Sequence, residues 1–285
     1  MTTATPVAAA AAASGQHIRA LQLGRFHIPL TVHRLPGDHP LALVLPALGV
    51  PASKYRLLLA TLAERGYHTA IAELPGTGDS HPQPGRQADY GYSDLVFEWI
   101  PLLLRALRTE FGGEPSLILG HSIGGQTVTL AARAGLTGNA HVVSVAAGHL
   151  DSRSWRGFKR AAVIGAALAA LASTRVLGYF PGKQLRFGGR EAATLMRDWG
   201  KGIIRGRFVP ETHIPRAAVL PRRSLHLCID GDPFAPRNAT QRLAELVSGE
   251  VRRIPPTYHK GNPHLSWIKN PAPVLDIVET WMTDD

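Results

Sequence analysis

Residues 117–125 read Leu-Ile-Leu-Gly-His-Ser-Ile-Gly-Gly, an apolar run that ends in a G-x-S-x-G motif centred on Ser122. The run predicts a buried strand, and the spacing after the motif predicts a helix. A sharp turn between the two needs small residues around its centre, because the folded-back backbone leaves no room for a Cβ atom. Such a turn exposes a serine hydroxyl above the sheet, so we predict that Ser122 is a nucleophile. An ordinary Gly-rich turn is the alternative.

Strand and helix patterns alternate on both sides of this turn. Apolar runs typical of strands buried on both faces occupy 41–45, 68–72, 116–119, 141–147 and 224–229, with a last strand expected at 250–254. Helical spacing is found at 55–65, 94–111, 125–134, 236–247 and 274–282. This alternation predicts an α/β fold with a mostly parallel central sheet flanked by helices. Residues 18–35 predict two short strands or a hairpin at the sheet edge.

Residues 151–223 interrupt the alternation with glycines and short helical pieces. Fifteen Lys or Arg against four Asp or Glu give this segment a charge of +11, whereas sixteen basic and seventeen acidic residues give the remainder −1. We predict a core made of residues 18–150 and 224–285, with 151–223 inserted as a cap. The positive charge indicates either a solvated face or attraction to anionic substrates or surfaces.

Composition restricts the class of protein. The chain has 285 residues, 45% of them hydrophobic, which is enough for a sizeable globular core. The single cysteine, Cys228, excludes an internal disulfide and is compatible with a reducing compartment, so we expect a cytoplasmic protein. No Cys/His cluster has the spacing of a zinc site, and we expect neither a metal nor a cofactor.

Two segments bear on targeting. Residues 1–17 are mostly Ala and Thr, with no basic residue in the chain before Arg19, so we expect a disordered leader, a weak export signal being the alternative. The longest apolar run, 161–172, has twelve residues. A run of this length is too short to cross a hydrocarbon core of about 30 Å as a helix, so no transmembrane segment is expected.

The Ser122 motif and two further loops resemble the α/β-hydrolase superfamily over nearly the whole chain after about residue 20. Residues 73–80, Glu-Leu-Pro-Gly-Thr-Gly-Asp-Ser, are similar to the family's turn after its fourth strand. Residues 45–50, Leu-Pro-Ala-Leu-Gly-Val, stand where the family has its oxyanion loop. Many members have His-Gly there, and this chain is closer to a bacterial group whose loop reads A-x-G-V. Residues 178–183 and 198–199 also resemble the cap of that group.

The resemblance implies a triad in the chain order serine, acid, histidine. It assigns the acid to Asp232 in the loop 230–236, Asp-Gly-Asp-Pro-Phe-Ala-Pro, with Asp230 as the alternative. The base is assigned to His264, which an apolar pair and the last helix follow, with His259 as the alternative. His121, inside the turn, needs no proton-transfer role.

The resemblance also implies two backbone N–H groups that would stabilise the oxyanion of a tetrahedral intermediate. One belongs to Ile123, directly after the nucleophile and at the start of a helix, where the helix dipole assists. The second is assigned to Leu48, a neighbouring amide being the alternative.

These residues predict a serine hydrolase, carboxylesterase- or lipase-like, that cleaves a carboxylic ester or thioester through an acyl-enzyme. Dehalogenases and epoxide hydrolases of similar fold have a carboxylate where this chain has Ser122. An acyltransferase or peptidase with the same triad, or a binding protein without catalysis, remains an alternative. The expected partner is a small molecule with an apolar acyl chain. Nucleic acid is not expected, because the basic segment lacks the known binding modules.

Overall fold

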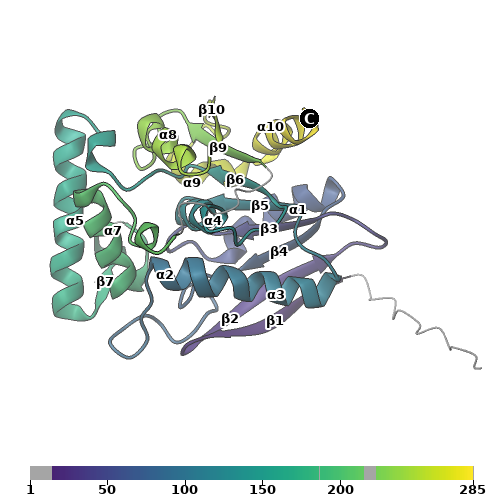
Figure 1. The fold of residues 1–285 in the computed structure, drawn as a ribbon, viewed down its shortest axis with the longest axis horizontal. Coiled ribbons are helices and arrows are strands. Elements are labelled where there is room, and N and C mark those ends of the chain that lie inside the picture. Colours follow the sequence, from purple (N-terminus) through teal and green to yellow (C-terminus); the bar gives the residue numbers. More distant parts are fainter. Residues whose placement is uncertain (1–14, 186, 215–222, 285) are drawn as a thin grey trace, which may run out of the picture.

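A computed structural model describes residues 15–185, 187–214 and 223–284, and its central feature is a twisted sheet with helices on both faces (Figure 1). The described strands of this sheet follow the order β1-β2-β4-β3-β5-β6-β9-β10. All neighbours from β4 to β10 are parallel, and β1 and β2 add an antiparallel edge. The strands are β1 (Gly15–Leu23), β2 (Phe26–Arg34), β3 (Leu41–Leu45), β4 (His68–Ala72), β5 (Leu117–His121), β6 (His141–Val145), β9 (Ser224–Ile229) and β10 (Glu250–Ile254).

The predicted α/β fold with a mostly parallel sheet is confirmed. Every residue of β3, β4, β5, β6 and β9 is buried, which explains why these strands read as continuous apolar runs in the sequence. The expected edge hairpin is present as β1 and β2, which pair from Leu23 and Phe26 outward. The carboxyl ends of β3, β5, β6 and β9 meet at one edge of the sheet, where ligands bind in folds of this class.

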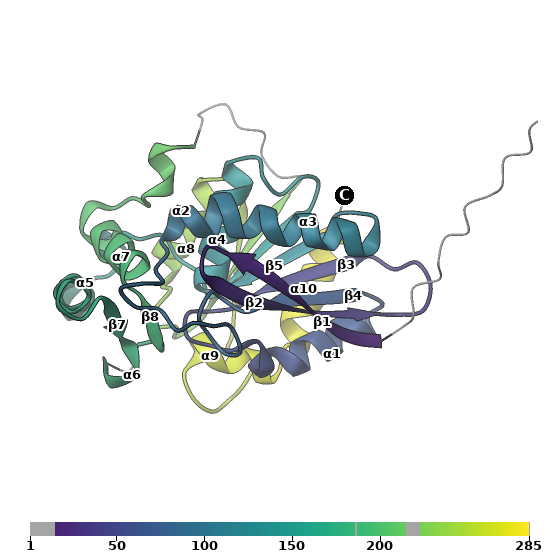
Figure 2. The ribbon, with the colours of Figure 1, turned by 90° about the horizontal axis from the view of Figure 1, so that it is seen from below.

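Two layers of helices cover the sheet (Figure 2). On one face lie α3 (Ile100–Phe111), α4 (Ile123–Arg133) and α8 (Arg237–Glu245), and on the other lie α1 (Arg56–Glu64) and α10 (Ala272–Thr283). Apolar side chains of each layer form a separate core against the sheet. Two short helices, α2 (Tyr92–Asp94) and α9 (Pro263–Ser266), lie close to the carboxyl edge.

Residues 151–214 leave the sheet after β6 and form a separate group of elements at the carboxyl edge (Figure 1). The group contains α5 (Gly157–Leu177), β7 (Tyr179–Pro181), α6 (Gly182–Leu185), β8 (Arg190–Ala192) and α7 (Ala193–Arg205). We call these elements the insertion. Part of the predicted cap segment, residues 186 and 215–222, lies outside the described residues.

Helix α5 corrects the expectation of short helical pieces and of an apolar segment too short to cross a membrane. The helix runs for 21 residues and extends beyond the apolar run 161–172 at both ends, because tertiary packing, which buries Thr174, overrides local propensity. By length and composition it is long and apolar enough to span a bilayer. Only 17% of its most apolar 18-residue stretch is buried inside the protein. Gly178 ends it in the left-handed conformation, with φ of 75°.

The predicted disordered leader, residues 1–17, includes three residues that belong to a strand. Gly15, Gln16 and His17 pair with β2 as the first residues of β1, because the hairpin ladder extends to Arg34. Residues 1–14, which hold the rest of the expected leader, lie outside the described part of the chain.

Candidate active site

Ser122 lies at the tip of the turn between β5 and α4. Its backbone has φ of 54° and ψ of −115°, a strained conformation for a residue with a side chain. A Cβ atom on Gly120 would collide with the backbone of Gly124, and one on Gly124 would collide with the backbone of Leu45. The glycines of the motif are therefore required by close backbone approach, and the turn raises the serine hydroxyl above the sheet.

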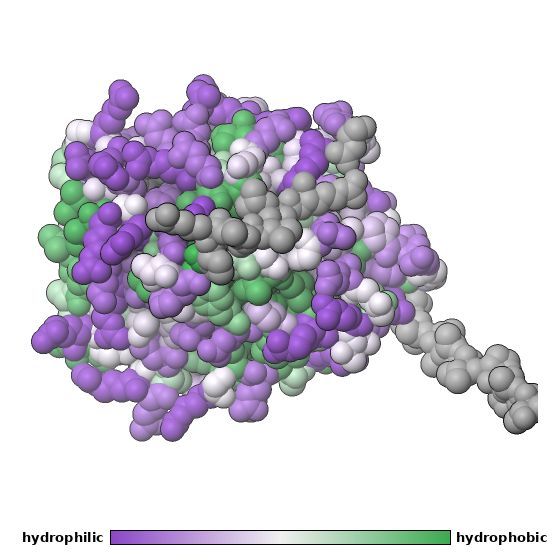
Figure 3. Space-filling view, viewed as in Figure 1, coloured by the Kyte–Doolittle hydropathy of each residue, from purple (hydrophilic) through white to green (hydrophobic). Residues whose placement is uncertain are grey.

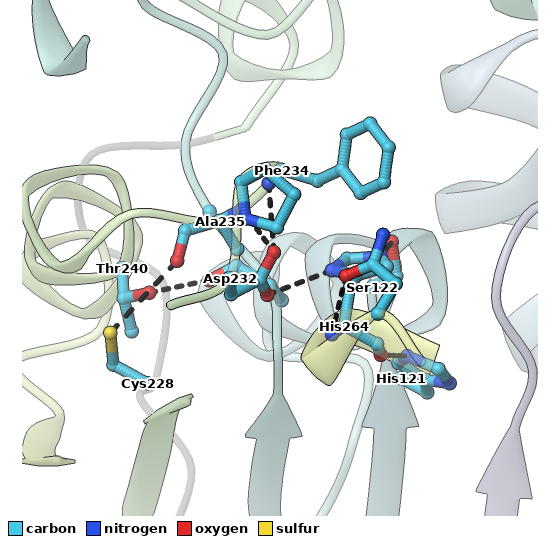
Figure 4. Close-up of polar contacts among 12 residues, drawn as sticks. His121, Ser122, Cys228, Asp232, Phe234, Ala235, Thr240 and His264 are labelled. Atoms are coloured by element: carbon cyan, nitrogen blue, oxygen red, sulfur yellow. Dashed lines mark hydrogen bonds and ion pairs between the residues drawn. The ribbon is translucent and has the colours of Figure 1, made fainter. Parts of the chain in front are cut away.

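Ser122, His264 and Asp232 form one chain of hydrogen bonds (Figure 4). The Ser122 Oγ atom lies 2.9 Å from His264 Nε2, and His264 Nδ1 lies 2.8 Å from Asp232 Oδ2. The carboxylate accepts the Nδ1–H, so Nε2 carries the lone pair that can accept the serine proton. The structure thus brings together three residues that are separated by up to 142 positions in the chain.

The loop around Asp232 fixes its carboxylate. Its second oxygen, Oδ1, accepts the backbone N–H of Phe234 at 2.7 Å and that of Ala235 at 3.1 Å. The side chain is fully buried, so these two bonds and the histidine compensate for its lost hydration.

The two alternative residues lie elsewhere. Asp230 bonds through both oxygens to Arg253 on β10, at 2.7 and 3.0 Å, and the guanidinium lowers the pKa of this carboxyl. His259 is exposed, with its ring 5.0 Å from that of Tyr258. The hydrogen bonds of the described residues join neither of them to Ser122.

The two residues expected to supply the oxyanion donors, Leu48 and Ile123, lie at the same pocket as the serine. Ile123 is the first residue of α4, where a backbone N–H has no partner within the helix. Leu48 lies in the loop after β3, and both residues line the same pocket as Ser122. The neighbouring Ala47 N–H donates to the Tyr55 hydroxyl at 2.8 Å and is therefore already engaged.

Tyr55 and His121 form a buried hydrogen-bonded pair beneath the His264 backbone, which no sequence motif indicated. The His121 ring lies 2.8 Å from the His264 carbonyl through Nε2, and 2.8 Å from the Tyr55 hydroxyl through Nδ1. The carbonyl can only accept, so Nε2 carries the proton and Nδ1 accepts the Tyr55 O–H. Burial lowers the pKa of His121 well below its ordinary value, which keeps this ring neutral. One continuous chain of hydrogen bonds therefore joins the Leu48 loop to the backbone of His264.

A cavity of about 460 Å³ extends from Ser122 toward the insertion. This volume falls within the range of small-molecule sites. Its walls combine the sheet edge, Phe234 and Leu265 with residues of α5, α6 and α7. The apolar side chains of the insertion that face it include Val163, Leu185, Phe187, Met196, Trp199 and Ile203.

A buried carboxyl group, that of Glu191, lies where the insertion packs against the Leu48 loop. Glu191 accepts the Gly189 N–H, and a Cβ atom on Gly49 would collide with the backbone of Gly189. Burial raises the pKa of Glu191 from 4.5 to about 7, although the bond to Gly189 acts in the opposite direction. Within the described ranges, no group of three or more His, Cys, Asp or Glu side chains could hold a metal ion.

Comparisons with known proteins agree with this architecture. A search of curated proteins finds no match. Among solved structures, a thioesterase domain from the curacin biosynthetic pathway has a TM-score of 0.58 at 16% identity, covering 93% of this chain and 99% of that one. E-2-(acetamidomethylene)succinate hydrolase has a TM-score of 0.60 at 17% identity, covering 94% and 99%.

Epoxide hydrolase A from Mycobacterium thermoresistibile has a TM-score of 0.60 at 16% identity, covering 92% of this chain and 97% of that one. At such identities these likenesses show the fold alone. The model of the alpha/beta hydrolase family matches residues 42–277, which include the Leu48 loop, the Ser122 turn, Asp232 and His264. The chain belongs to the α/β-hydrolase family.

Proposed function

We propose that this protein is a serine hydrolase that cleaves carboxylic esters or thioesters through an acyl-enzyme. The observation that carries the proposal is the hydrogen-bonded chain from Asp232 through His264 to Ser122, at the floor of an apolar pocket. A serine hydroxyl is a weak nucleophile until an imidazole accepts its proton, and the imidazole needs a carboxylate to hold its tautomer.

In the first half of the reaction, Ser122 Oγ attacks the acyl carbonyl carbon while His264 Nε2 takes the serine proton. The carbonyl oxygen becomes an oxyanion, which the N–H groups of Leu48 and Ile123 stabilise. The engagement of the Ala47 N–H with Tyr55 supports Leu48 over its neighbour. The bond to the leaving group then breaks, and His264 donates its proton to the departing alcohol or thiol.

In the second half, water attacks the acyl-enzyme. His264 takes a proton from the water, and the second oxyanion uses the same two N–H groups. Collapse of this intermediate breaks the bond to Ser122 Oγ, which regains its proton from His264. The carboxylic acid leaves, and no cofactor enters these steps.

The pocket supports an acyl group that is apolar and longer than acetyl. Its α5 and α7 walls carry aliphatic and aromatic side chains, and burying each methylene group there contributes about 0.8 kcal/mol. We propose that the insertion, the described part of the predicted cap segment 151–223, acts as a cap over this pocket. The thioesterase named above has the same fold, so the fold is compatible with a substrate of this class.

Two measurements test the function. A fluorophosphonate should label Ser122 in the folded protein, and mass spectrometry should locate the adduct. A panel of p-nitrophenyl esters of increasing acyl length should show kcat/KM rising with chain length before it falls. The Ser122→Ala variant should lose labelling and at least about 10³-fold in kcat.

The alternatives give different results. An adduct on another serine, or none on folded protein, would reject Ser122 as the nucleophile. Labelling with no hydrolysis of any ester would favour an acyltransferase or peptidase, whereas a protein that binds esters without labelling or turnover would be a binding protein. An epoxide hydrolase is disfavoured because the turn holds Ser122 where that mechanism uses a carboxylate.

A further inference from the structure

The outer face of α5 is apolar, exposed and without a partner in the described structure. It is formed by residues that recur at helical spacing: Phe158, Ala161, Gly165, Leu168, Ala172 and Val176, all of which are exposed. Phe158 is 86% exposed, Leu168 55% and Val176 69%. Figure 3 shows hydrophobic residues along the edge of the molecule that α5 forms. A contiguous exposed apolar surface of this kind marks an interaction site.

The opposite face of α5 packs against the rest of the protein. Ala167, Ala170 and Thr174 are buried, and a Cβ atom on Gly200 of α7 would lie 2.9 Å from the Ala167 carbonyl oxygen. The two helices therefore pack at close range through small residues. A helix held in this way can lie along a lipid surface, but it cannot cross a bilayer alone.

Charge identifies what the outer face contacts. Between residues 152 and 190 the sequence has eight Lys or Arg and no Asp or Glu, and of these Arg153 is paired with Asp151. Lys159 and Arg160 stand at the start of α5 and Arg175 near its end, so basic groups bracket the apolar stretch. A second copy placed on this face would oppose positive charge with positive charge, whereas an anionic lipid surface would complement it.

We propose that α5 docks the protein on an anionic lipid bilayer, with its outer face at the boundary between headgroups and acyl chains. An apolar face bordered by basic residues is the general form of an interfacial helix. Each Lys or Arg that reaches an anionic surface strengthens binding about fivefold. This inference goes beyond the proposed hydrolase function and does not depend on it, because docking requires no turnover.

Docking would bring the pocket to the lipid surface. Lys159, Ala162 and Ala166, on the adjoining face of α5, line the cavity above Ser122. At the same cavity, the exposed side chains Leu185, Phe234 and Leu265 are apolar. Lipid-soluble esters would reach such an opening directly from the bilayer.

Vesicle co-sedimentation of the full chain tests the proposal. We expect binding to phosphatidylcholine vesicles that contain about one third phosphatidylglycerol, and at least about tenfold weaker binding to phosphatidylcholine alone. Binding should weaken when salt rises from 0.1 M to 1 M, since the Debye length falls from about 10 Å to about 3 Å. The Leu168→Glu variant should bind the anionic vesicles at least about tenfold more weakly than the unaltered chain.

The matched control is Leu57→Glu. Leu57 is 49% exposed on α1, away from the insertion, so it makes the same chemical change on another surface and should leave binding unchanged. Circular dichroism spectra of both variants should match that of the unaltered chain, because neither side chain is buried.

Several results would overturn the proposal. These are no binding of the unaltered chain to anionic vesicles, full binding by Leu168→Glu, or equal losses in the two variants. A dimer that Leu168→Glu dissociates, without any vesicle binding, would assign the face to a second copy instead. Vesicle binding by a chain that hydrolyses no ester would sustain the docking and reject the proposed function, so the two failures are distinguishable.

Discussion

Two aspartates, two residues apart, have different environments at the end of β9. Asp232 is buried against His264 and two backbone N–H groups, whereas Asp230 pairs with Arg253 at the surface. Of the two carboxylates, only Asp232 is buried and bonded to the His264 imidazole, as expected for an acid that orients a catalytic histidine. Burial and partner choice, rather than residue type, therefore distinguish the two.

The Asp232→Asn variant should lose about 10³- to 10⁴-fold in kcat, because an amide no longer stabilises the productive tautomer of His264. Asp230→Asn should retain kcat within about threefold, since an exposed ion pair contributes little. Steady-state hydrolysis of one p-nitrophenyl ester by both variants measures this. A large loss of kcat in Asp230→Asn, with kcat of Asp232→Asn nearly unchanged, would assign the acid to Asp230.

The Tyr55 hydroxyl accepts the Ala47 N–H and donates to His121, so removing it leaves two buried polar groups unpaired. Tyr55→Phe should lower the free energy of unfolding by about 1–3 kcal/mol. It should also lower kcat more than it raises KM, because the loop that carries Leu48 loses an anchor.

Tyr67→Phe is the control, because among the described residues the Tyr67 hydroxyl has only a 4.0 Å contact, with Met282 Sδ. Urea unfolding and steady-state kinetics compare the two variants. Equal stability losses, with kcat unchanged in both, would show that Tyr55 does not position the site.

At the scale of elements, α5 presents different faces to the pocket, to α7 and to the outside. Ala166 lines the cavity, whereas Ala172 belongs to the outer face. Small residues on the pocket side leave room in the cavity. If the proposed function holds, we expect α5 to limit the length of the acyl chain that fits there.

Ala166→Phe should fill part of the cavity and reduce kcat/KM for long-chain esters by about tenfold or more, while acetate ester hydrolysis changes little. Ala172→Phe should change neither, because it does not line the cavity. Comparing water-soluble acetyl and decanoyl esters for both variants measures the shift. An unchanged chain-length profile in Ala166→Phe would place the acyl chain elsewhere.

At the scale of the whole molecule, Glu191 makes stability depend on pH. Its pKa is about 7 in the folded chain and near 4.5 when exposed, so only the folded chain keeps this proton between those values. The contribution of protonated Glu191 to the free energy of unfolding is complete below about pH 4.5 and is lost as the pH rises through about 7. Above pH 7 the folded protein holds a buried negative charge where the insertion meets the Leu48 loop.

Glu191→Gln removes that charge while keeping the acceptor for the Gly189 N–H. At each pH, the free energy of unfolding of the variant is compared with that of the unaltered chain. This difference should favour the variant by up to about 3 kcal/mol more at pH 8 than at pH 4.5. Urea unfolding of both proteins at the two pH values gives this double difference, which cancels the titration of other groups. A difference near zero would mean that the carboxyl titrates normally.

Features that depend on neighbouring residues are predictable from the order of amino acids alone. The fully buried strands are recognisable because a strand covered on both faces needs apolar residues at every position, and the predicted ranges 41–45, 68–72 and 224–229 match β3, β4 and β9. The Ser122 turn is recognisable because its close backbone approach admits only glycine at 120 and 124. The resemblance then pointed to Asp232 and His264.

Contacts between segments that are distant in the chain become evident in the folded protein and not before. Local pattern left Asp230 open as the acid, because the hydrogen bond between Asp232 and His264 joins segments that are 32 residues apart in the chain. It did not reveal the hydrogen bonds that join Tyr55, His121 and the backbone of His264, and it gave α5 too short a length. Helix ends and buried polar networks depend on which surfaces contact each other in the folded protein. Hydrophobic periodicity along a chain contains no information about those contacts.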